Sequence, residues 1–186
     1  MAAAAVRPAT RADAEEIARI QLATWRTAYA ALLPAGLLSG VDEAAAAAQW
    51  RDTIDTGPAL VFVATEGRWL VGFGAAGPAP RSESAGADGA PPADAAHLAL
   101  VSTLLVEPRW GRRGHGGRLL AAAAAALRVT GHTRGICWVP EADTASTSFY
   151  RRAGWAPDGT VRTLDAGGVP LRELRLSGAL DLELTQ

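Results

Sequence analysis

Residues of one face in the first part of the chain, three of them large and apolar or aromatic, repeat with the period of an α-helix. Ile17, Gln21, Trp25 and Tyr29 are spaced four residues apart, so they share one face of a helix that begins near Ala14. Further along the chain the apolar positions form short continuous runs instead. The pattern therefore predicts a chain that mixes helices and strands.

Short runs rich in β-branched and aromatic residues predict the strands. The predicted strands cover residues 5–8, 60–64, 69–73, 97–106 and 134–139, and two more follow Trp155, with turns at 158–159 and 167–168. Four helices are predicted. The first begins near Ala14 behind the candidate N-caps Thr10 and Asp13, and the second runs unevenly from Pro34 to Trp50. The third covers 118 to about 129, and the fourth covers 144–152 behind Asp143 or Thr144. The order β-α-α-β-β-β-α-β-α-β-β indicates a layered, mixed α/β fold.

The segment 77–95 differs in composition from the rest of the chain. Prolines and glycines are frequent in it and stand among alanine, serine and aspartate. Loops of this length are usually functional lids or disordered segments. We expect a long flexible loop inside one domain.

The charge balance limits the classes of partner. The 186 residues include 18 basic and 19 acidic groups, with a net charge of -1, so we expect no nucleic-acid or membrane partner. Every basic residue is arginine, because the sequence contains no lysine. This excludes a Schiff-base lysine and the phosphate-binding lysine of a P-loop.

Cysteine usage and hydropathy indicate the compartment. The single cysteine, Cys137, excludes an internal disulfide framework and is typical of a reducing compartment. It lies in an apolar strand, where we expect a buried, unreactive thiol. No apolar run is long enough to span a bilayer, and the first residues lack the pattern of a signal peptide. We therefore expect a soluble, cytoplasmic protein of one domain.

A glycine-rich loop follows the predicted strand that ends at Val106. Its glycines allow close approach of the backbone to a phosphate, the next helix begins with outward-pointing amides, and Arg112, Arg113 and Arg118 add positive charge. A dinucleotide site would need a glycine where Leu119 stands, and a P-loop would need lysine. Two interpretations remain, a pyrophosphate-binding loop of the acyl-coenzyme A type and a glycine-rich turn with incidental arginines.

Two segments in order resemble the signature motifs of one family. Residues 104–110 (LLVEPRW) and 113–116 (RGHG), followed by Leu119 and Leu120, are similar to the acetyl-CoA-binding motif of the GNAT superfamily of N-acetyltransferases. Residues 138–143 (WVPEAD) and 148–155 (SFYRRAGW) are similar to the second motif of that family. The resemblance extends over nearly the whole chain.

The resemblance implies a fold and an activity. The fold is a twisted, mostly antiparallel central sheet of about seven strands flanked by about four helices. The activity is direct transfer of an acetyl group from acetyl-CoA to a primary amine of a small molecule or peptide, and a homodimer is compatible with it. Tyr150 would protonate the leaving thiolate, and the amide near Val106 would polarise the acetyl carbonyl. The residues implied to bind acetyl-CoA are Leu104, Leu105, Val106, Arg112, Arg113, Gly114, His115, Gly116, Gly117 and Asp143.

Three positions depart from the family's pattern. Gly111 stands where relatives usually have glutamine or arginine, and Asp143 stands where they usually have asparagine. An ionised aspartate only accepts hydrogen bonds, so capping the following helix is an equally good interpretation of Asp143. Leu100 occupies the position of a glutamate that serves many relatives as general base. These departures motivate an alternative function, a non-catalytic acyl-CoA-binding sensor or degenerate module.

The remaining aromatic and histidine residues allow fewer conclusions. Trp25 and Tyr29, with Trp50, are candidates for lining an acceptor pocket, although their spacing also fits core packing. Tyr150 likewise fits a core aromatic. The three histidines show no metal-ligand spacing with acidic or cysteine partners, so we expect no metal site.

Overall fold

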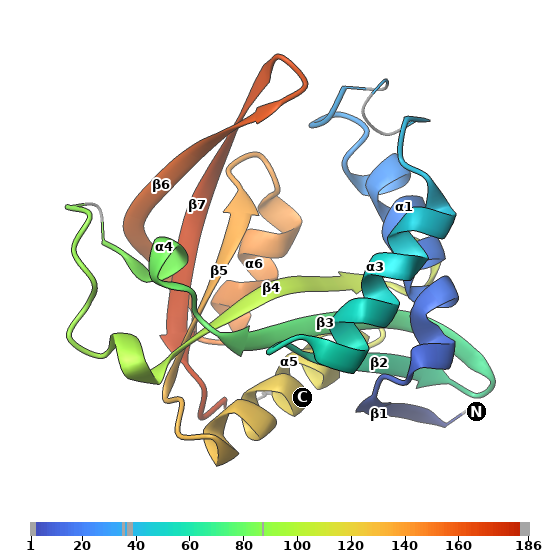
Figure 1. Ribbon diagram of the computed structural model, residues 1–186, viewed down its shortest axis with the longest axis horizontal. Helices are drawn as coiled ribbons and strands as arrows, with labels where there is room; N and C mark the ends of the chain where they lie inside the picture. The colour runs from blue at the N-terminus through green and yellow to red at the C-terminus, as the bar shows by residue number, and fades with distance from the viewer. Residues whose placement is uncertain (1–2, 35, 37–38, 87, 183–186) are drawn as a thin grey trace. The chain divides into compact units, whose positions relative to one another are not determined.

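The computed structural model describes residues 3–34, 36, 39–86 and 88–182. Seven strands form one mostly antiparallel sheet in the order β1-β2-β3-β4-β5-β7-β6 (Figure 1). The strands are β1 (Ala4–Pro8), β2 (Leu60–Glu66), β3 (Trp69–Pro78), β4 (Leu98–Val106), β5 (Arg134–Pro140), β6 (Ala156–Ala166) and β7 (Val169–Ala179). The parallel pair β4 and β5 is in register only over Leu98–Leu100 and Arg134–Ile136.

Helices connect the strands in the predicted order. They are α1 (Ala14–Ala28), α3 (Glu43–Thr56), α4 (Arg81–Ser84), α5 (His115–Val129) and α6 (Thr144–Arg152). Short 3-10 turns cover Arg11–Asp13, Ala95–His97 and Pro108–Trp110. The expected mixed α/β class and seven-stranded sheet are confirmed, with α4 as a helix that was not predicted. Within the described part of the chain, no helix is long and apolar enough to cross a membrane.

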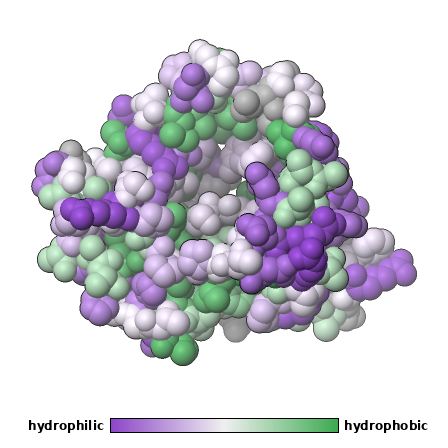
Figure 2. All heavy atoms as spheres, viewed as in Figure 1, coloured by the Kyte–Doolittle hydropathy of each residue, from purple (hydrophilic) through white to green (hydrophobic). Residues whose placement is uncertain are grey.

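The chain divides into two compact units. The first consists of Met1–Ala75 with Thr103–Ala123, and the second of Ala76–Ser102 with Ala124–Gln186. The strands β3 and β4 and the helix α5 each contribute residues to both units. That the chain is one domain remains a prediction. On the face shown in Figure 2, both hydrophilic and hydrophobic residues reach the surface, and hydrophilic residues gather at its right side.

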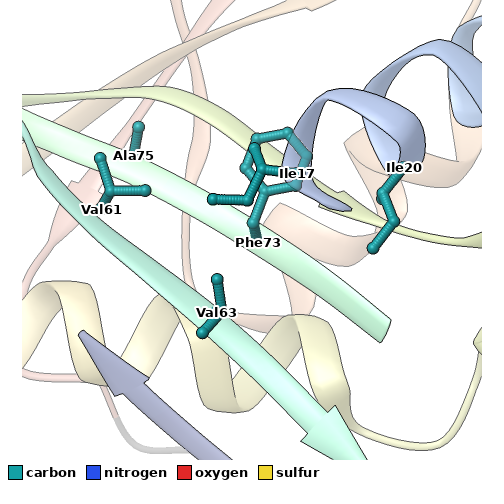
Figure 3. Packing of buried hydrophobic residues seen from close by; sticks show 6 residues of the cluster. All are labelled: Ile17, Ile20, Val61, Val63, Phe73 and Ala75. Atoms are coloured by element: carbon teal, nitrogen blue, oxygen red, sulfur yellow. The ribbon is translucent and has the colours of Figure 1, made fainter. Parts of the chain in front are cut away.

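The core of the first unit lies between α1, α3 and the strands β2 and β3. Its buried residues, shown in Figure 3, are Ile17, Ile20, Val61, Val63, Phe73 and Ala75. Trp50 of α3 packs against this cluster and meets the ring of Phe73 edge-on, with the ring centroids 5.0 Å apart. The indole N–H of Trp50 donates to Oε1 of Gln21 at 2.8 Å. Core packing is therefore the role that the structure gives Trp50.

The core of the second unit contains the fully buried Trp155, against which α6 packs. A Cβ atom at Gly135 or Gly178 would lie within 2.4 Å or 2.1 Å of the Trp155 side chain, so both strands need glycine there. The indole N–H donates to the carbonyl oxygen of Ala179 at 3.1 Å. The ring of Tyr150 also stacks on Trp155, with a centroid distance of 5.4 Å.

Several predicted boundaries differ from the structure. The helical region expected from Pro34 to Trp50 contains helical residues at Gly36 and Ser39 and then α3, which begins at Glu43, while residues 35 and 37–38 lie outside the described part. The turn expected at 158–159 is instead an irregularity inside β6, where the register with β7 shifts between Pro157 and Val161. The positive φ of Gly159, 90°, accommodates this irregularity without ending the strand.

The segment 77–95 contains an anchored helix. The guanidinium of Arg175, which is buried, donates to the carbonyl oxygens of Glu83 at 2.9 Å and Ala85 at 2.6 Å. Arg162 donates to the carboxylate of Glu83 at 2.8 Å. These bonds hold α4, whereas the flexibility of the whole segment remains a prediction.

The start of α1 is held by Asp13. Its carboxylate accepts two hydrogen bonds of 2.8 Å from Arg7, and it also accepts from the backbone N–H of Thr10 at 2.7 Å and from the Thr10 hydroxyl at 2.9 Å. The hydrogen bonds from Arg7 are the main reason that the pKa of Asp13 is lowered from 3.8 to about 2. Asp13 thus supports the first turn from the last position of the 3-10 turn, and not by capping α1 with its own side chain.

We predict that Asp13→Asn lowers the free energy of unfolding at pH 7 by about 1–2 kcal/mol. Because the folded protein lowers the pKa, the stabilisation is present above pH 4 and is lost as the pH falls from about 4 to about 2. Urea unfolding of both proteins at several pH values should show the difference shrinking over that range. Glu15→Gln is a matched control, since its ion pair with Arg51 is exposed. An Asp13→Asn effect that does not change with pH would contradict the ion-pair origin.

Candidate functional site

The glycine-rich loop connects the end of β4 to α5. The helix begins at His115, three residues earlier than predicted, and its first closing bond joins the N–H of Arg118 to the carbonyl oxygen of Gly114 at 3.1 Å. The N–H groups of His115, Gly116 and Gly117 precede that bond, so the helix offers them no acceptor. Together with the helix dipole, these amides form a site suited to an anion.

Two left-handed residues shape this loop. Gly114 has a φ of 81°, and a Cβ atom there would lie 3.3 Å from the guanidinium of Arg118. Arg112 has a φ of 59° and is the one residue other than glycine with positive φ in the described ranges. This conformation costs about 1 kcal/mol for a non-glycine residue. The loop turns through Arg112 and leaves that side chain exposed.

A carboxylate from β2 braces the loop from the other side. Glu66 accepts from the guanidinium of Arg113 at 3.1 Å and contacts Nε2 of His115 at 2.9 Å. The guanidinium of Arg118 donates to the backbone oxygen of Arg113 at 3.0 Å. The ring of His115 is therefore buried against β2, whereas the sequence indicated a role for its backbone amide alone. Glu66 was not predicted, because nothing in its local sequence distinguishes it from a turn residue.

A second carboxylate, Glu107, ties the end of β4 to α1. Arg19 donates to its two oxygens at 3.1 Å and 3.3 Å, and Nε of Arg109 lies 3.1 Å from Oε2. Burial by itself would raise the pKa of Glu107, but the hydrogen bonds from Arg19 and Arg109 outweigh it and hold the pKa below 4.5. The backbone N–H of Glu107 also donates to Val71 at 2.9 Å. The loop thus starts from an anchored strand end.

The predicted acceptor residues lie at the other end of α1. Trp25 and Tyr29 are half-buried in its last turn, where the N–H of Tyr29 donates to the carbonyl oxygen of Trp25 at 3.1 Å. Their role in binding an acceptor remains a prediction.

The second unit contains the predicted residues of α6. Asp143 is the N-cap of this helix, and its two carboxylate oxygens accept from the backbone N–H of Ser146 at 2.9 Å and from the Ser146 hydroxyl at 2.7 Å. The capping role is confirmed. Contact of Asp143 with a cofactor remains a prediction, and both of its oxygens already have donors.

Tyr150 lies on the buried side of α6. The residue is 6% exposed, and its ring stacks on Trp155 and meets Phe149 edge-on at 5.0 Å. Its side chain also forms a hydrogen bond with the thiol of Cys137 on β5. Burial raises the pKa of that thiol to about 12, and the bond from Tyr150 opposes the shift only in part. The expected burial of Cys137 is confirmed, and Tyr150 is held by contacts on its ring and on its hydroxyl.

The predicted residues therefore form two groups. The first unit brings together the end of β4, which holds Leu104, Leu105 and Val106, and the loop and helix start that hold Arg112, Arg113, Gly114, His115, Gly116 and Gly117. The second unit holds Asp143 and Tyr150. Among the residues that the structure describes, no three histidine, cysteine, aspartate or glutamate side chains are grouped so that they could hold a metal ion.

Comparison with known proteins gives consistent matches. The model of the Acetyltransferase (GNAT) family matches residues 18–155. An uncharacterized N-acetyltransferase of Bacillus subtilis (strain 168), YuaI, is 31% identical over 173 residues, which cover 92% of this chain and 90% of YuaI.

Solved structures share the fold at low sequence identity. The PaiA N-acetyltransferase of Thermoplasma acidophilum, in complex with coenzyme A, has a TM-score of 0.71 at 15% identity. The match covers 95% of this chain and 99% of PaiA. The putative acetyltransferase YncA of Salmonella typhimurium, with acetyl-CoA, has a TM-score of 0.69 at 17% identity, with 96% of this chain and 95% of YncA covered.

We predict that Cys137 reacts slowly with a thiol reagent such as DTNB in the native protein at pH 8. A pKa of about 12 in place of 9.0 lowers the thiolate fraction by about 10³-fold. The reaction should become fast in concentrated guanidinium chloride, and Cys137→Ser should show no reaction in either state. Rapid stoichiometric labelling of the native protein would contradict the buried position of the thiol.

Proposed function

Because the chain belongs to the GNAT acetyltransferase family, we propose that it transfers an acetyl group from acetyl-CoA to a primary amine of a small molecule or peptide. The observation that carries this proposal is the anion site at the start of α5, directly after β4. The single cysteine supports a reducing, cytoplasmic location for the reaction.

The loop fits the pyrophosphate of a coenzyme A thioester. The amides of Gly114, His115, Gly116 and Gly117 would donate to its oxygens, and the exposed guanidinium of Arg112 would supply positive charge. Donors of this kind suit the pyrophosphate without a metal ion or lysine. The absence of lysine from the sequence therefore does not weaken the proposal.

Acetyl-CoA supplies an activated thioester, and the chain's own groups assist its transfer. The backbone N–H near Val106, at the end of β4, would donate to the acetyl oxygen and stabilise the negative charge that develops there. When the amine attacks the acetyl carbon, the C–S bond breaks and the amine loses a proton. The hydroxyl of Tyr150 would give a proton to the leaving sulfur.

The contacts of Tyr150 support this assignment. Its ring rests on Trp155, and its hydroxyl reaches Cys137, so the phenol is oriented before a substrate arrives. A tyrosine oriented this way is also a good core aromatic. The proton acceptor for the amine is not Leu100, because that side chain is a hydrocarbon. Water or an acidic group elsewhere must take that proton.

A second function is favoured by two observations. Both oxygens of Asp143 are occupied by Ser146, and Leu100 stands where a base is common. A module that binds acyl-CoA without transferring the acyl group would need neither a free carboxylate at Asp143 nor a general base at Leu100. Turnover of any amine in a broad panel, measured as release of the coenzyme A thiol, would exclude this alternative.

We predict that calorimetric titration with acetyl-CoA, with coenzyme A as a second ligand, gives a dissociation constant in the micromolar range. Arg112→Gly should weaken binding by about five- to tenfold, because it removes a charge from the phosphate site while glycine tolerates the left-handed φ. Arg128→Ala is the matched control, since it removes an exposed arginine from the last turn of α5, at the end opposite the anion site. Absence of acetyl-CoA binding by the unmodified protein would overturn the proposed function.

We predict that Tyr150→Phe lowers kcat by at least about tenfold and leaves the dissociation constant of acetyl-CoA nearly unchanged. The change removes only the hydroxyl, so the stacking on Trp155 is kept. Cys137→Ala removes the hydrogen-bond partner of that hydroxyl and should change kcat far less. An unchanged kcat in Tyr150→Phe would remove Tyr150 from the chemistry and leave it as a core residue.

A further inference from the structure

The carboxylate of Glu66 joins two parts of the anion-binding loop. It is the last residue of β2, and its side chain is 18% exposed. Oε1 accepts from Nη1 of Arg113, which precedes Gly114, and Oε2 lies 2.9 Å from Nε2 of His115, the first residue of α5. One carboxylate therefore contacts the residues on both sides of Gly114, where the chain enters the helix.

We propose that Glu66 is a positioning residue for the pyrophosphate site, and that Arg113 acts as its partner and does not bind the phosphates itself. The inference rests on the proposed function, because the ligand that benefits is the pyrophosphate of acetyl-CoA. It assigns different roles to Arg112 and Arg113, two adjacent arginines that are equivalent in the sequence.

The contacts of Arg113 support this division. Its guanidinium lies 5.0 Å from the ring centroid of Trp110 and forms the ion pair with Glu66. Its backbone oxygen accepts from Arg118. The side chain and the backbone of Arg113 are thus both engaged inside the loop, although its side chain is 52% exposed. Arg112 and Arg118 are exposed as well, and Arg118 donates to the backbone of Arg113. Within the described residues no side-chain bond engages Arg112, so we assign the phosphate contact to it.

The burial of His115 explains why its contact with Glu66 matters. The His115 side chain is only 1% exposed, and its Nδ1 is buried with no hydrogen-bond partner among the residues that the structure describes. Contact with the carboxylate places a hydrogen on Nε2, since the carboxylate can only accept. Without Glu66, neither ring nitrogen would have a partner, and burying such a ring is costly. The ring would then leave its position, and the first turn of α5 carries the amides of the anion site.

A purely electrostatic role of Glu66 and a positioning role predict opposite changes in binding when its charge is removed. A carboxylate close to a bound polyanion repels it, so neutralising Glu66 would tighten binding if the residue acted only through its charge. A positioning role predicts weaker binding, because the amides are no longer held together. The sign of the change therefore separates the two mechanisms.

The test compares Glu66→Gln, Arg113→Gln and the double variant by calorimetric titration with coenzyme A. Glutamine keeps the size of the side chain but offers one acceptor oxygen in place of two. We expect each single variant to weaken binding by about tenfold and the double variant to weaken it little further, since both remove the same brace. Glu15→Gln, which breaks an exposed ion pair with Arg51, should bind as the unmodified protein does. Tighter or unchanged binding by Glu66→Gln, or fully additive losses in the double variant, would overturn the proposal.

A second measurement does not depend on the ligand. The chain has three histidines, so the ring ¹⁵N resonances of His115 can be assigned by substitution. We expect a hydrogen on Nε2 in the unmodified protein. In Glu66→Leu, which leaves no acceptor for that hydrogen, we expect loss of the signature together with faster amide exchange over 114–117. An unchanged His115 signature in that variant would overturn the positioning role. If the unmodified protein showed the signature but bound no coenzyme A, the proposed function would fail while the brace itself would stand.

Discussion

Three backbone N–H groups at the start of α5 have no acceptor within the helix, and the surrounding loop is arranged around them. A helix always leaves its first amides unsatisfied, and at most helix starts a side chain or water completes them. Here the residue at the cap position is Gly114, which has no side chain to accept from them. Its positive φ brings the chain into the helix, and the left-handed Arg112 makes the preceding turn. The left-handed conformation of Arg112 is a local cost of this turn.

Carboxylates at strand ends hold the elements that meet at this loop. Glu107 follows β4 and binds Arg19 of α1, while Glu66 ends β2 and contacts Arg113 and His115. Each is mostly buried and each has two cationic or hydrogen-donating partners, so its charge is compensated where it lies. These two carboxylates therefore act as structural anchors, while Arg112, Arg113 and Arg118 are exposed in the loop and the first turn of the helix. This arrangement explains how a chain with a net charge of -1 can present a site suited to an anion.

In the second unit, the packing around Trp155 orients the phenol of Tyr150. Gly135 and Gly178 make room for Trp155, Trp155 supports the ring of Tyr150, and the Asp143 cap begins the helix that carries it. The same packing that forms the core would also orient Tyr150 for the proton transfer proposed for it. For this reason burial alone does not separate a catalytic tyrosine from a structural one, and only a change in kcat does.

Local patterns were sufficient for much of this protein. The order of strands and helices, the glycine-rich loop after β4, the cap at Asp143 and the buried Cys137 follow from residue periodicity, turn residues and helix-cap chemistry, which act over a few neighbouring positions. The boundaries were less accurate where two local tendencies compete. Glycines at 116 and 117 are poor helix formers, yet α5 begins before them, and Gly159 is a turn residue, yet β6 continues through it. Only the tertiary structure decided these points, because packing and strand pairing outweigh a local preference of about 1 kcal/mol. It also decided which of two adjacent arginines is engaged: Glu66 lies 49 residues before His115, and a contact over that separation depends on where β2 and α5 pack and leaves no local pattern in the chain.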